Sequence, residues 1–134
     1  MIVADTSALL ALIDADDHHH EAVRSLFEED PASWVLPWAI LPEVDYLLLR
    51  HVSLEAELAF LGDVAEGRFE VVWGDERDVA RSRYLARRHR DLALGLVDGV
   101  VMAVAERLRA RAIATLDRRH FGAVGLQGTP LLLP

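Results

Sequence analysis

The chain opens with the stretch MIVADTSALLALI, residues 1–13, and this stretch decides the class of fold. Four apolar residues, two of them β-branched, lead into Asp5, and apolar residues at helical spacing follow it. The pattern predicts a short buried strand over 1–4 that ends at Asp5, then a helix capped by Thr6 or Ser7. The chain therefore begins with a β-strand that leads directly into an α-helix.

The same alternation of strands and helices continues to the end of the 134 residues. Further strands are expected at 34–36, 69–73, 112–115 and 131–133, and further helices at 18–29, about 42–50, 54–66, 76–90 and 96–109. In the helix at 76–90, the apolar residues available to the core are Val79, Ala80, Tyr84 and Ala86. Strands that alternate with helices predict one α/β domain over 1–134, with a mostly parallel sheet flanked by helices.

Composition excludes several classes of protein. The chain has no cysteine, which rules out disulfide scaffolds, thiolate metal sites and cysteine nucleophiles and agrees with a reducing compartment. All 14 basic residues are arginine, so enzymes that depend on a lysine, such as P-loop NTPases and Schiff-base enzymes, are excluded as well. No apolar run is long enough to span a membrane, and no secretory signal is visible at the N-terminus. A cytoplasmic location is therefore expected.

The net charge of −8 is unevenly distributed along the chain. Residues 1–76 carry 17 acidic residues and 3 arginines, whereas residues 77–134 carry 5 acidic residues and 11 arginines. An acidic half and a basic half within one small domain call for a functional explanation.

Acidic residues are expected to gather at one edge of the predicted sheet. Asp5 and Asp117 follow predicted strands, and the carboxyl ends of parallel strands form the functional crevice of open sheets. Glu43 follows Pro42, a residue type favoured at the first helical position, and a helix that follows a parallel strand begins at that same edge. Asp98 opens the most apolar helix, but that helix follows another helix, so the same argument does not place it.

Each acidic residue has a structural alternative, because Asp and Glu in a first helical turn also act as caps or as partners of the helix dipole. Four acidic residues that gather at one edge of the sheet are harder to explain as caps or dipole partners. Two carboxylates about 4 Å apart repel by roughly 4 kcal/mol at an effective dielectric constant of about 20. With no lysine to neutralise them, a hard divalent cation such as Mg²⁺ or Mn²⁺ is expected.

A cation of this kind can lower the pKa of water and stabilise the charge that develops in phosphoryl transfer. The chain contains neither of the glycine-rich loops that bind nucleotides. The sequence therefore favours hydrolysis of a phosphodiester over binding of a nucleotide.

Four segments, in this order and spacing, carry a resemblance to a known family. They are IVADTSALLAL at 2–12, Pro42-Glu43, LGLVDG at 94–99 and IATLDRRHF at 113–121. Through them, and most specifically through the Asp-Thr-Ser of the first and the Thr-Leu-Asp-Arg-Arg-His-Phe of the last, the chain resembles a PIN domain of the VapC toxin type.

The resemblance implies a small α/β/α sandwich and a Mg²⁺- or Mn²⁺-dependent ribonuclease that cleaves tRNA, rRNA or mRNA. It further implies a homodimer and a VapB-type antitoxin that blocks the activity. The residues that correspond to the catalytic and metal-binding quartet of the family are Asp5, Glu43, Asp98 and Asp117. Ser7 and Thr115 correspond to its supporting hydroxyls. Gly99 stands where relatives often carry alanine, and little effect is expected beyond a looser helix start.

Arginines provide candidate contacts to RNA phosphates. Arg118 and Arg119 directly follow Asp117, and Arg88 belongs to the helix at 76–90, which carries six arginines. The alternative is a solvated helix face, and the sequence leaves both open. His120 lies beside the expected site, where it can contact a phosphate or serve a structural or capping role.

Two other functions are compatible with parts of the pattern. A catalytically silent PIN-fold module would bind RNA or a protein without metal-dependent turnover, although the intact quartet disfavours it. A phosphatase of the haloacid dehalogenase type also has an aspartate at a strand end, but it needs a second aspartate where this chain has Ser7, and usually a lysine. The favoured hypothesis is a metal-dependent endoribonuclease that acts as a VapC-like toxin.

Overall fold

The computed structural model describes all 134 residues and contains a five-stranded sheet in which every pairing is parallel. The strands are β1 (Ile2–Ala4), β2 (Trp34–Pro37), β3 (Glu70–Val72), β4 (Ala112–Ala114) and β5 (Leu131–Leu133). Their order in the sheet is β3-β2-β1-β4-β5, so β1 lies at the centre. The predicted α/β fold is confirmed, and the sheet is parallel throughout.

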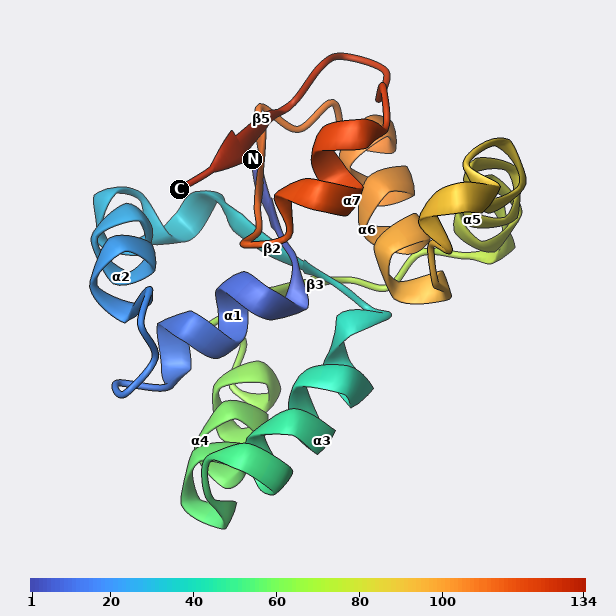
Figure 1. The fold of residues 1–134 in the computed structure, drawn as a ribbon. Helices are drawn as coiled ribbons and strands as arrows, with labels where there is room; N and C mark the ends of the chain where they lie inside the picture. Colours follow the sequence, from blue (N-terminus) through green and yellow to red (C-terminus); the bar gives the residue numbers. More distant parts are fainter.

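Seven α-helices and two short 3-10 helices connect the strands. The α-helices are α1 (Thr6–Ile13), α2 (His20–Glu29), α3 (Ile40–His51), α4 (Leu54–Ala65), α5 (Glu76–Arg88), α6 (Leu96–Arg107) and α7 (Arg118–Ala123), and the 3-10 helices are η1 (Pro31–Ser33) and η2 (Arg90–Leu92). Crossovers between parallel strands are right-handed, so connections that run in opposite directions along a sheet cover opposite faces. Figure 1 shows α1 to α4 on one side of the sheet and α5 to α7 on the other, which is an α/β/α sandwich. None of the helices has the length and apolar character needed to cross a lipid bilayer.

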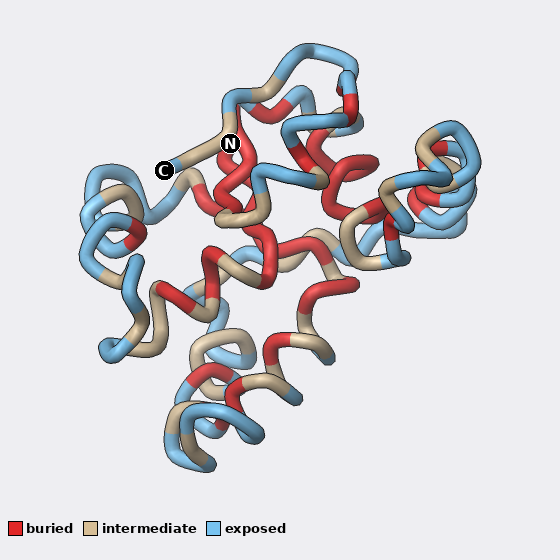
Figure 2. The backbone as a smooth tube through the Cα atoms, in the orientation of Figure 1, coloured by how far each residue is buried: buried red, intermediate tan, exposed pale blue.

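The core lies in the central strands and in α6, because a parallel sheet is covered on both faces. Every residue of β1, β2 and β4 is buried, and 29 buried apolar residues form one cluster. In α6, all residues from Gly99 to Ala105 are buried, as the apolar sequence of this helix predicted. Figure 2 shows the buried segments running through the centre of the molecule, with α2, α4 and α5 largely exposed.

The strand order creates a switch point between β1 and β4. The connection that leaves β1 covers one face of the sheet through α1, and the connection that leaves β4 covers the other face through α7. Open α/β sheets bind ligands in the crevice outside the carboxyl ends of the strands at such a point. Asp5 directly follows β1 and Asp117 lies shortly after β4, so the topology brings both residues to this crevice.

The buried face of α5 differs from the expected one. Its buried residues are Asp78, Ser82 and Leu85, whereas Val79 and Tyr84 are 42% and 52% exposed. Polar residues face α6 because each meets a matching group there: Asp78 is paired with an arginine of α6, and Ser82 packs against a glycine of α6. The apolar residues of α5 were therefore a misleading guide to its orientation.

Gly99 lets α5 approach α6 closely, which adds a packing role to the looser helix start expected of glycine at this position. A Cβ atom at Gly99 would lie 2.0 Å from the Oγ atom, 2.7 Å from the Cβ atom and 3.0 Å from the Cα atom of Ser82. The last of these atoms is backbone, so α5 itself would have to move.

Replacing Gly99 with alanine is therefore expected to lower the free energy of unfolding by about 1–3 kcal/mol, the usual cost of overpacking a filled interface. Urea denaturation measures this loss. Ser82→Gly removes the two closest contacts, so alanine at position 99 should cost clearly less in a Ser82→Gly background. An equal cost in both backgrounds would contradict the steric explanation.

Candidate metal centre

Asp5 lies at the switch point, where it ends β1 and begins α1. It occupies the N-cap position of α1, which the sequence had assigned to Thr6 or Ser7, and it is only 4% exposed. The assignment was wrong because the backbone N–H of Asp5 still donates to the carbonyl of Ala114 in β4, at 2.9 Å, and the helix begins at the next residue. This contact fixes the Asp5 backbone against β4.

Two hydroxyl groups hold the Asp5 carboxylate by the same oxygen. The hydroxyls of Ser7 and Thr115 donate to Asp5 Oδ2 at 2.9 and 2.8 Å. Each of these hydroxyl oxygens also accepts a backbone N–H from the loop after β4. The N–H of Leu116 donates to Ser7 Oγ at 2.9 Å, and the N–H of Asp117 donates to Thr115 Oγ1 at 3.0 Å. Both hydroxyls are therefore fixed, and no side chain donates to Asp5 Oδ1.

Glu43 faces Asp5 from the start of α3. This helix begins at Ile40, before Pro42, so Glu43 is its fourth residue rather than its second, yet it still lies in the first turn. Burial raises the pKa of Asp5 above its ordinary value, the hydroxyl hydrogen bonds oppose this shift, and the negative charge of Glu43 adds to it. The structure thus brings Glu43 within electrostatic reach of Asp5.

Asp98, Asp117 and His120 form a compact cluster beside Asp5. One donor atom from each of the three residues lies within 4.8 Å of the other two. His120 Nδ1 lies 3.0 Å from an oxygen of Asp98 and 3.0 Å from an oxygen of Asp117, and its backbone N–H caps the other oxygen of Asp117 at 3.0 Å. Asp98 reaches the crevice because α6 runs antiparallel to the strand that follows it, so its first turn lies at the carboxyl edge.

The electrostatics of Asp98 show how closely these acids approach. Burial raises the pKa of Asp98 to about 6, with the charges of Asp5 and Asp117 adding to the shift and His120 opposing it. The pKa values of both Asp5 and Asp98 are therefore raised, which means that the surroundings of these two groups disfavour their ionisation. A divalent cation would relieve this repulsion, and a site with carboxylates and no thiolate suits a hard cation, although Asp5 and Glu43 are not part of the compact cluster.

A pH dependence of stability follows for the protein in the presence of chelator. Asp98 has a pKa of about 6 in the folded chain, against 3.8 for the free group, so it stabilises the fold below pH 4 and loses this contribution as the pH rises through 6. Asparagine is uncharged throughout. We expect Asp98→Asn to raise the melting temperature by several degrees at pH 7.5 in EDTA and by almost nothing at pH 4. Equal shifts at both pH values would contradict the assignment.

His120 is the member of the cluster whose role the sequence left open. Its position as third residue of α7, after an N-capping aspartate, was the available signal, because a residue at this place folds back toward its cap. The arginines proposed as RNA contacts are not part of the cluster. Arg118 and Arg119 are exposed at the start of α7, where Arg118 donates to the carbonyl of Pro134, and Arg88 is exposed at the end of α5.

The fold and this arrangement define the class of protein. The chain belongs to the PIN domain family, whose model matches residues 2–125. A relative, Ribonuclease VapC26 of Mycobacterium tuberculosis, is 34% identical over 123 residues, which cover 92% of this chain and 91% of the relative.

Solved structures share the fold over nearly the whole chain. VapC20 of Mycobacterium tuberculosis, described as a toxin that cleaves the sarcin-ricin loop, has a TM-score of 0.84 at 22% identity and covers 97% of this chain and 99% of its own. DNA-bound VapBC from Salmonella typhimurium has a TM-score of 0.71 at 20% identity, covering 98% and 95%. A toxin–antitoxin complex from Klebsiella pneumoniae has a TM-score of 0.70 at 18% identity, covering 92% of each chain.

Proposed function

We propose that this protein is a metal-dependent endoribonuclease that acts as a VapC-like toxin and is neutralised by a VapB-type antitoxin. The observation that carries the proposal is the gathering of Asp98, Asp117 and His120 beside the buried Asp5, at the switch point of a PIN fold. The 34% identity to a ribonuclease supports the activity, and the likeness to toxin–antitoxin complexes supports the partner.

In this proposal Mg²⁺ or Mn²⁺ is held by four carboxylates, those of Asp5, Glu43, Asp98 and Asp117. When bound, such a cation lowers the pKa of water and stabilises negative charge on a phosphate. Asp5 offers Oδ1, because Ser7 and Thr115 already occupy Oδ2. Arg118 and Arg119, exposed beside Asp117, bind phosphates that flank the cleaved bond, and so does Arg88.

The hydroxyl of Thr115 is expected to matter for metal affinity although it does not itself carry a charge. Thr115→Val keeps the shape of the side chain but removes the donor to Asp5 Oδ2 and the acceptor for the Asp117 N–H. We expect Mg²⁺ affinity, measured by calorimetry, to fall by about 10- to 100-fold. Thr129→Val, on the loop before β5, serves as the control and should leave the affinity unchanged.

The direct test of the proposed activity is RNA cleavage by the purified protein with Mg²⁺, with Mn²⁺ and with EDTA. Cleavage that requires a divalent cation supports the proposal. A protein that binds RNA but cleaves it under none of these conditions would instead be a catalytically silent module.

The antitoxin and the homodimer are tested separately. Co-expression with the reading frame that neighbours the gene should yield a complex in which cleavage is suppressed. Light scattering of the isolated protein then measures whether it forms a dimer.

A further inference from the structure

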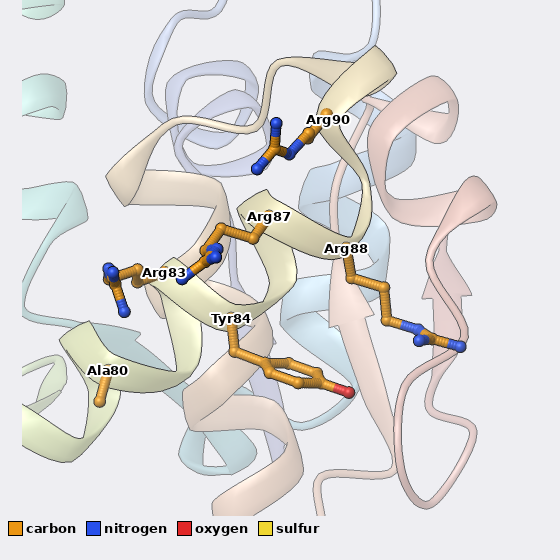
Figure 3. A pocket seen from close by; sticks show the side chains of 6 residues that line it. All are labelled: Ala80, Arg83, Tyr84, Arg87, Arg88 and Arg90. Carbon is orange, nitrogen blue, oxygen red and sulfur yellow. The ribbon is translucent and has the colours of Figure 1, made fainter.

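An open pocket of about 420 Å³ lies on α5 and on the turn that follows it. The residues that line it are Ala80, Arg83, Tyr84, Arg87, Arg88 and Arg90, so four of six are arginines and none is acidic. In Figure 3 the guanidinium groups of Arg83 and Arg87 extend to the same side of α5, with Arg90 above them and Tyr84 below. The pocket is therefore strongly positive in a chain whose net charge is −8.

The four pocket arginines, three in α5 and one in η2, differ from Arg77 and Arg81 because none of them pairs with a carboxylate. Arg77 forms an ion pair with Asp75 at 2.7 Å, and Arg81 forms one with Glu106 at 3.0 Å. Like charges four residues apart on a helix, as at positions 83 and 87, destabilise it. The helix dipole favours Arg87 and Arg88, which lie in the last turn of α5, but it does not account for Arg83, and an external anion would neutralise the cluster.

Tyr84 adds an aromatic surface to the cluster. Its side chain is 52% exposed, and the guanidinium carbon of Arg81 lies 4.8 Å from the ring centroid. Arg81 is itself fixed by hydrogen bonds to both carboxylate oxygens of Glu106, at 3.1 and 3.0 Å. The ring is thus held in place while it remains accessible, as a surface for stacking requires.

The pocket lies on α5, the helix that packs against α6, and Asp98 lies in the first turn of α6. Ser82 packs against Gly99, and these residues are the chain neighbours of Arg83 and Asp98. Arg90 lies in η2, the turn that leads into α6. The pocket and the acidic centre are therefore carried by two helices in direct contact.

We propose that this pocket is an RNA-binding subsite, in which Arg83 and Arg87 bind a backbone phosphate and a neighbouring base stacks on Tyr84. The proposal rests on the proposed ribonuclease function. Guanidinium groups bind phosphate in a bidentate manner, and exposed aromatic rings stack with unpaired bases. An acidic protein segment would match the charge but would make no specific use of the ring.

The test is binding of a fluorescein-labelled, mixed-sequence single-stranded RNA of twelve nucleotides, followed by fluorescence anisotropy in EDTA. We expect Arg83→Ala with Arg87→Ala to weaken binding by about tenfold or more, since hydrogen bonds to charged groups are lost. The slope of log K against log salt should also fall by about 0.7, because the two arginines bind one phosphate and each single-strand phosphate contact contributes about 0.7. Arg24→Ala with Arg68→Ala removes the same charge from α2 and from the turn after α4 and should change neither quantity.

Tyr84 provides an independent arm of the test. Tyr84→Ala should weaken RNA binding by about 5- to 100-fold, whereas Tyr84→Phe, which keeps the ring, should bind within about twofold of the original chain. The proposal is overturned if the double arginine variant binds RNA as well as the Arg24/Arg68 control. The proposal is also overturned if the double arginine variant keeps its RNA binding and loses only the binding of a polyglutamate peptide. That result would identify a protein ligand.

The two proposals fail in different ways. If the original chain cleaves RNA and the double arginine variant binds and cleaves like its control, the subsite is disproved and the ribonuclease stands. If the original chain never cleaves RNA but loses RNA binding on substitution of the pocket, the ribonuclease is disproved and the subsite stands.

Discussion

Asp98→Asn is expected to lower the rate of Mg²⁺-dependent RNA cleavage by at least about 100-fold. Asp98 supplies one of the donor atoms that lie within 4.8 Å of one another, and its substitution removes a negative charge from the proposed metal site. Groups that only support metal ligands already change affinity or activity by about 10- to 100-fold, so a ligand should exceed that range. The measurement is kcat/KM with a labelled RNA at saturating Mg²⁺.

Asp91→Asn is the matched control, because Asp91 is an exposed aspartate in the connection that precedes α6. It makes the same change of charge outside the cluster and should keep full activity. The melting temperature of the Asp98 variant, which is expected to be higher than that of the original chain in EDTA at pH 7.5, separates a loss of activity from misfolding. Full activity of Asp98→Asn would contradict the proposed role of the acidic centre.

The second large effect is on stability and comes from the interface between α5 and α6. Arg107 donates to both oxygens of Asp78, from Nε at 3.1 Å and from Nη2 at 3.0 Å, and Asp78 is only 2% exposed. Arg107→Ala leaves a buried carboxylate without its partner. We expect the free energy of unfolding to fall by about 3 kcal/mol or more, measured by urea denaturation.

Two further variants check this explanation. Arg77→Ala breaks an exposed ion pair on the same helix and should leave the melting temperature nearly unchanged. Replacing both buried partners, with Asp78→Leu and Arg107→Met, should restore most of the lost stability, because no buried charge then lacks a partner. A small loss in Arg107→Ala would mean that solvent reaches Asp78 and that the pair does not hold the helices together.

Local patterns in the sequence were sufficient for the class of fold and for the expectation that Asp5 and Asp117 lie at one edge of the sheet, but not for the place of Asp98. The strand before Asp5, the apolar helix after Asp98 and the strand before Asp117 each carry a clear hydrophobic signal, and parallel strands bring their carboxyl ends to one edge. The strand order could not be predicted from the sequence, because it depends on which strands pair with β1. The switch point between β1 and β4 therefore emerged only from the structure.

What the sequence missed depends on partners that are distant along the chain. The buried face of α5 is polar because its partners, Gly99 and Arg107, come from α6. No periodicity within residues 76–88 contains that information. His120 joins Asp98 for a similar reason, since the two residues are 22 positions apart and meet only when α7 docks beside α6.

The central place of β1 also governs when activity can arise during synthesis. The first strand pairs with β4, and the Asp5 carboxylate is held by Thr115, 110 positions later in the chain. A growing chain on the ribosome can form the β1–β2 pair early, but it has no complete acidic centre until residues 112–120 have emerged. Long-range parallel pairing is intrinsically slow to form, which delays the centre further. A ribonuclease built in this way stays inactive toward the RNA of its own translation until residue 120 has been made.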